Sequence, residues 1–292
     1  MKVKKITFPI CLLALVSLAF FSCQNNQSGT SGNNGADTLT KTPPQTGKIK
    51  QGQDTDSYVL PSPLQLASIM VRSSGFKYMP DICSPVKNAA QFNSHYQMAV
   101  NLGIYSTDLS YCLINKKNDD ATKYLNEVKI LADQLGFGGI FKSNSFVQRF
   151  QNNMNVPDSL ASLIGELQMG IDTYLEENNQ KYINSIAYSG ALIESLYIAG
   201  TVYEKEKNQG EGPFITEQMD VTEGLIRLLT KNQSFDNNIP TLLSQLREIS
   251  TLYNSFDEVK NKSADKPVVL TPDHISQMNK AIKDLREKFI AS

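Results

Sequence analysis

Apolar residues recur at intervals of three and four along most of the chain after residue 57, and this spacing restricts the fold to packed amphipathic helices. No stretch alternates convincingly between apolar and polar residues, although residues 267–270 are compatible with a short extended piece. The connections between the stripes are short, which favours antiparallel neighbours. We therefore predict an all-α single domain over residues 58–292, with eight or nine mostly antiparallel helices in a bundle or irregular array.

Serine or threonine followed by proline marks several predicted helix starts, because the hydroxyl caps a helix and proline suits its first turn. Ser84 and Pro85 accordingly predict a long helix from Pro85 to about Asn115. Cys83 and Cys112 would then lie at opposite ends of this helix, roughly 40 Å apart at about 1.5 Å per residue. Since a disulfide needs Cα atoms within about 7 Å, we predict two separate, mostly buried thiols. Further starts are predicted at Ser62-Pro63, Pro157-Asp158 and Thr271-Pro272.

Small side chains gather in the predicted helix around residues 183–200, where Ala187, Gly190, Ala191 and Gly200 follow one another closely. Glycine inside a helix costs about 1 kcal/mol relative to alanine, so its presence calls for a packing reason. We expect a neighbouring helix to approach this segment closely.

The N-terminus has the pattern of a bacterial lipoprotein signal. Three lysines precede an apolar stretch over residues 6–21, which is shorter than the roughly 20 residues of a membrane span. The segment that ends in Ser22 and Cys23 resembles a lipobox, in which the thiol receives diacylglycerol, the chain is cut before the cysteine and the new amino terminus is acylated. We expect residues 1–22 to be a signal peptide and Cys23 to be the site of lipid attachment.

The next segment is too polar to fold. From Gln24 to Ser57 only Ala36, Leu39 and Ile49 are apolar, so the segment cannot bury a core. We predict that residues 23–57 contain the lipidated cysteine and a disordered tether, whose root-mean-square span is on the order of 30 Å.

Charge and the residues after Cys23 bear on location and partners. The mature chain loses three lysines and no acid, which leaves 25 basic against 29 acidic residues and a net charge of −4. There is no basic excess to hold nucleic acid. Gln24 is not the aspartate typical of inner-membrane retention, and residues 24–28 lack the acidic cluster typical of surface export. We expect attachment to the outer membrane facing the periplasm, with a periplasmic or outer-membrane protein as a possible partner.

Motifs for catalysis or cofactor binding are not convincing in this sequence. Residues 136–143 narrowly miss the phosphate-loop pattern, and Ser84 to Lys87 fits S-x-x-K without the other elements of penicillin-interacting enzymes. His95 and His274 are the only histidines, and no H-E-x-x-H or C-x-x-C is present, so we predict no metal and no cofactor. Whether the protein is an enzyme stays open.

Two acids interrupt otherwise apolar or small stretches, and they are the strongest candidates for a site. Asn101, Tyr105 and Asp108 share one helix face, while Glu194 and Tyr197 belong to a later helix. If the two helices pack together, the carboxyl groups form either a polar pocket for ligand binding or hydrolysis, or an internal hydrogen-bond network that fixes helix register.

Three segments of the chain resemble a family of uncharacterised, secreted, all-helical lipoproteins of Bacteroidota. They are residues 60–65, the segment from Asn101 to Tyr111, and the segment from Ser189 to Gly200. The resemblance implies an envelope location and a helical fold, and it implies no particular reaction.

The sequence as a whole favours a membrane-tethered lipoprotein of the cell envelope with a non-catalytic binding or scaffolding role. The alternative is a small-ligand receptor or hydrolase whose polar pocket surrounds Asp108 and Glu194.

Overall fold

The computed structural model describes residues 78–86, 91–142, 145–206, 211–263 and 267–291. The predicted signal peptide over residues 1–22, the lipidation site at Cys23, the tether over residues 23–57 and the helix start at residues 62–63 lie outside these ranges. The folded part is therefore described from Tyr78 onward.

The described residues form helices and connections without any strand, which confirms the predicted all-α class. Eight helices have eight or more residues, and two further helices are single turns, so the predicted number of eight or nine holds for the longer ones. None of these helices combines the length and the apolar character that a membrane span requires. The elements are η1 (Pro80–Ile82), α2 (His95–Ile114), α3 (Asn118–Gln134), α4 (Gly139–Lys142), α5 (Phe146–Asn153), α6 (Pro157–Glu177), α7 (Lys181–Glu206), α8 (Glu211–Lys231), α9 (Ile239–Ser255), α10 (Asp257–Lys260) and α11 (Pro272–Ala291).

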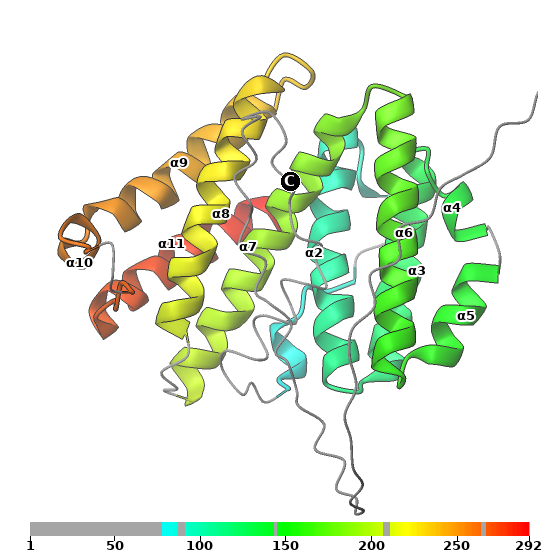
Figure 1. Ribbon diagram of the computed structural model, residues 1–292, viewed down its shortest axis with the longest axis horizontal. Helices are drawn as coiled ribbons and strands as arrows, with labels where there is room; N and C mark the ends of the chain where they lie inside the picture. Colours follow the sequence, from blue (N-terminus) through cyan, green and yellow to red (C-terminus); the bar gives the residue numbers. More distant parts are fainter. Residues whose placement is uncertain (1–77, 87–90, 143–144, 207–210, 264–266, 292) are drawn as a thin grey trace, which may run out of the picture. The chain divides into compact units, whose positions relative to one another are not determined.

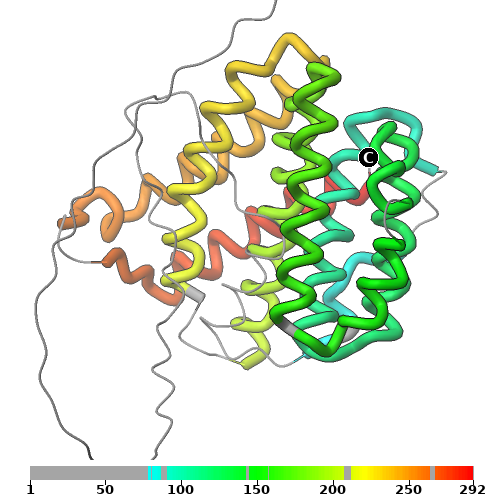
Figure 2. The backbone as a smooth tube through the Cα atoms, turned by 45° about the vertical axis from the view of Figure 1, so that its right-hand side comes forward, coloured from blue at the N-terminus to red at the C-terminus, as the bar shows by residue number. Residues whose placement is uncertain are grey.

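Helix α7 is the central element of the array. It lies between α2 on one side and α8 on the other, with α3 beyond α2 and α9 beyond α8 (Figures 1 and 2). Helices α6 and α11 also pack against α7, so this helix touches four neighbours. Because α7 is surrounded, it is apolar or small on nearly every face, and most of its residues from Ile183 to Val202 are buried.

Close approach between α2 and α7 confirms the prediction from the small residues. A Cβ atom on Gly190 would come within 2.1 Å of the Val100 carbonyl oxygen, and one on Gly103 within 1.7 Å of the Ala187 carbonyl oxygen. Thr107 Oγ1 donates to the Ala191 carbonyl at 3.3 Å. From the Gly103–Ala187 contact to the Thr107–Ala191 contact the chain advances by four residues on both helices, so α2 and α7 run parallel, in contrast to neighbours joined directly by a short connection.

The segment over residues 78–86, here called the strap, corrects one sequence prediction. No helix begins at Pro85; α2 begins ten residues later, where Ser94 Oγ accepts a hydrogen bond from the Gln97 amide at 3.1 Å. The strap instead lies along α2, and the Met79 amide donates to the Tyr111 hydroxyl at 2.9 Å.

The thiols of Cys83 and Cys112 are therefore not separated. Cys83 belongs to the strap and Cys112 to the part of α2 beside it, and the two thiols lie within hydrogen-bond reach of each other. The prediction of separate thiols was wrong because it rested on one unbroken helix over residues 85–115. Both cysteines are free in this structure, Cys112 buried and Cys83 partly exposed.

Candidate functional site

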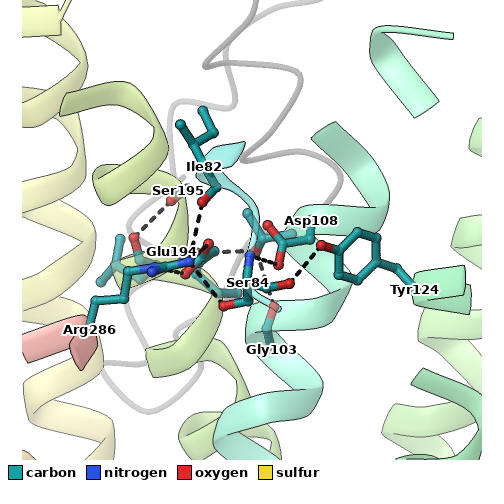
Figure 3. A network of polar contacts seen from close by, with 11 residues as sticks. Ile82, Ser84, Gly103, Asp108, Tyr124, Glu194, Ser195 and Arg286 are labelled. Carbon is teal, nitrogen blue, oxygen red and sulfur yellow. Dashed lines mark hydrogen bonds and ion pairs between the residues drawn. The ribbon is translucent and has the colours of Figure 1, made fainter. Parts of the chain in front are cut away.

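A buried ion pair joins α7 to α11. Arg286 Nε donates to Glu194 Oε2 at 2.5 Å, and Arg286 Nη2 donates to Glu194 Oε1 at 2.7 Å (Figure 3). Glu194 is 0% exposed and Arg286 is 7% exposed. The guanidinium carbon also lies 3.9 Å from the centre of the Tyr197 ring, so an aromatic face covers the cation. Burial weakens screening by water and so strengthens the ion pair. The two parallel hydrogen bonds also fix the orientation of the two side chains.

The strap closes the network from the other side. Arg286 Nη2 also donates to Ser84 Oγ at 3.0 Å and to the Ile82 carbonyl at 3.3 Å. The Ser84 amide donates to Asp108 Oδ2 at 3.0 Å, and the Tyr124 hydroxyl donates to the Ser84 carbonyl at 2.7 Å. One serine thus binds side chains from α2, α3 and α11 (Figure 3). The network fixes the strap against α2, α3 and the distant α11.

Burial favours the protonated form of the Asp108 carboxyl group in this network. Its pKa is raised well above the usual value because the carboxyl group is fully buried and because Glu194 lies beside it; Arg286 and the Ser84 amide oppose the rise. Among the described residues no N–H or O–H group donates a hydrogen bond to Asp108 Oδ1. The carboxyl groups of Asp108 and Glu194 nevertheless lie within hydrogen-bond reach of each other. A protonated Asp108 that donates to Glu194 satisfies both oxygens.

Charge in the network is then balanced. Burial raises the pKa of Glu194, while hydrogen bonds and the positive charge of Arg286 oppose that rise. One guanidinium faces one carboxylate, and the second carboxyl group is neutral. This arrangement avoids the large penalty of an unpaired charge in the interior.

The structure brings together three of the five residues predicted from sequence. Asp108 and Glu194 meet directly, and Tyr197 joins them through Arg286. Tyr105 lies one contact away, because its ring centre is 6.0 Å from that of Tyr124 and its hydroxyl lies 3.4 Å from the Pro85 carbonyl oxygen.

The fifth residue, Asn101, does not join the group. Its Nδ2 donates to the Gln97 carbonyl of its own helix at 2.9 Å. A shared helix face therefore identified Tyr105 and Asp108 correctly, but it did not tell a network residue from one that bonds within its helix.

Sequence reasoning missed Arg286 and assigned Ser84 to a helix cap. A signal for Arg286 is present in α11, where Ile282, Leu285 and Phe289 form the buried stripe and position 286 falls on the same face. A cation in a core position needs a buried anion as its partner. Ser84 carries no such signal, because its role depends on how the strap folds over α2.

Chemically, the network is suited to holding the fold and not to turning over a substrate. Asp108 and Glu194 are both 0% exposed, and their partners are all groups of this chain. In the described part of the chain, no three His, Cys, Asp or Glu side chains come together in a way that could hold a metal ion. The geometry favours the internal network over the catalytic pocket.

A second feature lies on the neighbouring face of α2. A partly open cavity of about 110 Å³ lies between α2, α3, α6 and α7, and Phe141 of α4 and Phe150 of α5 also line it. Its wall is mostly aliphatic and aromatic. The serine hydroxyls in the wall, at Ser106 and Ser110, donate to carbonyls of their own helix. Residues that define the wall include Leu109, Leu125, Phe137, Phe150, Ile164 and Tyr188.

Polar side chains join α6 to α7 at the rim of this cavity. Gln168 Nε2 donates to Asp172 Oδ1 at 3.1 Å, and Asn184 Nδ2 donates to the same oxygen at 3.1 Å. Gln168 and Asn184 both line the cavity, whereas Asp172 is exposed. The cavity therefore has an apolar interior and two polar side chains in its wall, which bond to Asp172 outside it.

The chain matches no family model, and no curated protein or solved structure is significantly similar to it.

Proposed function

We propose that this protein is a lipid-anchored binding protein of the cell envelope, attached through Cys23, which takes a small apolar group into the cavity between α2, α3, α6 and α7. The observation that carries the proposal is the cavity itself, with its apolar wall and its polar rim. Small-molecule sites in proteins have this composition: a concave apolar interior and a few polar groups that orient the ligand.

The size of the cavity limits the ligand. A cavity of about 150 Å³ in another protein stays dry and binds benzene, and the cavity here has a volume of about 110 Å³. It therefore suits one short aliphatic chain or one ring, and not a whole lipid. A polar head on the ligand would meet Asp172 and Asn184 at the rim, which favours a head that donates hydrogen bonds.

A binding role without catalysis agrees with the state of the two acids. Asp108 accepts a hydrogen bond from the Ser84 amide, and Glu194 accepts from Arg286. Both acids are fully buried. A hydrolase with two carboxyl groups needs them to flank the bond that is cut. The apolar cavity lies on the next face of α2, so the proposal separates the binding site from the acids.

Membrane attachment is the other half of the proposal. The lysine-rich start, the apolar stretch over residues 6–21 and the small residue before Cys23 support processing as a lipoprotein. Two or three acyl chains give durable attachment, whereas a single chain would be marginal. We propose the periplasmic face of the outer membrane as the location.

The binding proposal is tested with a series of n-alkanols from butanol to decanol, measured by isothermal titration calorimetry on the purified chain. Each methylene that enters the cavity should strengthen binding by about 0.8 kcal/mol, or roughly fourfold in Kd. Affinity should then level off once the cavity is full. Ala187→Leu, which places a larger side chain in the wall, should abolish the trend.

The matched control is Ala161→Leu, which adds the same side chain at an exposed position of α6. This control should bind the alkanols as the unmodified protein does. Absence of binding throughout the series, or binding that Ala187→Leu leaves unchanged, would contradict the proposed site.

A further inference from the structure

The two thiols of the folded region meet at the junction between the strap and α2. The Cys83 and Cys112 side chains lie within hydrogen-bond reach of each other, and the Tyr78 hydroxyl lies 4.0 Å from the Cys112 sulfur. These contacts lower the pKa of Cys112, and the pKa of Cys83 is raised because of its contact with that sulfur and because it is buried. The two groups therefore behave as one donor and acceptor pair.

The contact is held in place by bonds on both sides of Cys83. On the N-terminal side, the Tyr78 and Tyr111 rings stack with their centres 5.5 Å apart, and the Met79 amide donates to the Tyr111 hydroxyl. On the C-terminal side, the Ser84 amide donates to Asp108.

Asp108, Tyr111 and Cys112 follow one another at intervals of three and one residues, so they share a face of α2. The strap is bonded to the first two of them. Cys83 therefore faces Cys112 because the strap is in register with this face, and the meeting of the thiols does not depend on one flexible side chain.

We propose that Cys83 and Cys112 form an intrachain disulfide when the folded protein meets a disulfide donor, and that this bond locks the strap to α2. The net reaction converts two protein thiols and one donor disulfide into one protein disulfide and two donor thiols. Two electrons and two protons pass to the donor, so atoms and charge balance. The proposal stands on the strap and α2 alone and does not depend on the apolar cavity.

Exposure sets the order of the two exchange steps. Cys83 is partly exposed whereas Cys112 is fully buried, so a donor reaches Cys83 first. As the Cys83 sulfur attacks the donor disulfide, its proton passes to the departing donor sulfur, which leaves a mixed disulfide and one donor thiol. Cys112 then attacks the Cys83 sulfur, and its proton passes to the second departing donor sulfur, which leaves as the second donor thiol.

The direct test is peptide mapping of the folded full chain after incubation with glutathione disulfide. Free thiols are blocked with iodoacetamide under denaturing conditions, and the chain is cut with trypsin without reductant. Cleavage after Lys77, Lys87 and Lys116 separates the two cysteines into peptides 78–87 and 88–116. The expected product is these two peptides joined, two hydrogens lighter than their sum, and separated by dithiothreitol.

Other products would overturn the proposal. They are recovery of both peptides in alkylated form, a glutathione adduct that persists on Cys83, or pairing of either thiol with Cys11 or Cys23. The variant Cys83→Ser serves as the control, because it removes the joined product and leaves Cys112 to be alkylated.

Thermal unfolding gives an independent readout. The bond closes a loop of about 30 residues, so reduction should lower the Tm of the oxidised protein by roughly 5 to 10 °C. Cys83→Ser should unfold at the same Tm with and without reductant. An oxidised wild type whose Tm is unmoved by dithiothreitol would show that the strap is not locked by this bond.

Discussion

Arg286 is the residue on which the buried network depends. It is the one cation among the network residues, and it binds Glu194 on α7 together with Ile82 and Ser84 of the strap. A buried charge that loses its partner costs far more free energy than an exposed one. Arg286, Glu194 and Asp108 should therefore differ sharply in how well they tolerate substitution.

Loss of either partner of the Glu194–Arg286 ion pair should strongly destabilise the fold. We expect Glu194→Gln or Arg286→Met to lower the free energy of unfolding by about 3–5 kcal/mol, because each leaves an unpaired charge in the interior. Asp108→Asn should change it by less than about 1 kcal/mol, since an amide can accept from Ser84 and donate to Glu194 as the protonated acid does. Urea unfolding at pH 7 measures all three variants, and equal losses in the three would disprove a protonated Asp108.

The protonation of Asp108 also predicts how stability depends on pH. Since the pKa of Asp108 is raised in the folded state, the folded chain binds this proton more tightly than the unfolded chain does. The stabilisation is complete below the unfolded pKa of about 3.9 and is lost as pH rises towards the folded pKa. Between pH 5 and pH 8, the unfolding free energy of the wild type should therefore fall relative to that of Asp108→Asn. Parallel pH profiles for the two proteins would count against the shift.

The sequence pointed to Asp108 and Glu194 but not to the residues that bind them. Asp108 and Glu194 stand out because they interrupt apolar stretches, and such interruptions are visible without a structure. Arg286 is 92 positions beyond Glu194, and Ser84 acts through its backbone amide as well as its hydroxyl. A partner as distant as Arg286, and a bond from the backbone amide of Ser84, produce no pattern in the sequence near Asp108 or Glu194.

Among the helices, the contact between α2 and α7 is the tightest constraint, because their backbones meet where Gly190 has no side chain. A methyl group there would come within 2.1 Å of the Val100 carbonyl oxygen. We expect Gly190→Ala to destabilise the protein by roughly 1–3 kcal/mol through overpacking.

Gly165→Ala is the matched comparison, because α6 leaves nothing within 4 Å of a Cβ at that position. It should stabilise the protein by about 0.5–1 kcal/mol, the ordinary preference of a helix for alanine. Urea unfolding should thus give opposite signs for the two substitutions. Stabilisation of both would mean that α2 and α7 are farther apart than described.

Helix boundaries show where sequence patterns are ambiguous. Ser84 and Ser94 are both possible capping residues for the helix that contains Asn101 to Tyr111, and only Ser94 caps α2. Pro85 made the earlier serine the stronger local signal. Tertiary bonds from Ser84 to Asp108 and Arg286 outweigh that preference, and a local pattern does not contain them.

For the molecule as a whole, the class of fold followed from the apolar stripes, because each stripe must be buried against another helix. Which helices pair did not follow. Helices α2 and α7 run side by side although α3 to α6 separate them in sequence. The wall of the cavity likewise comes from six helices, so no single segment shows it.

The proposed attachment to the membrane is tested through Cys23. We expect the wild type to incorporate labelled palmitate in a bacterial host and to sediment with membranes. Cys23→Ser should lose the label and move to the soluble fraction, because acyl chains and not the folded region provide attachment. A variant that stays in the membrane fraction would point to an uncleaved apolar anchor over residues 6–21.

The apolar binding site is tested most directly by a crystal structure of the chain with a short bromoalkanol, located by the anomalous signal of bromine. We predict one strong bromine peak inside the cavity, among Leu109, Phe150 and Ile164, with the hydroxyl directed towards Asn184. A cavity filled by its own side chains, or bromine peaks confined to the outer surface, would contradict an apolar binding site between α2, α3, α6 and α7.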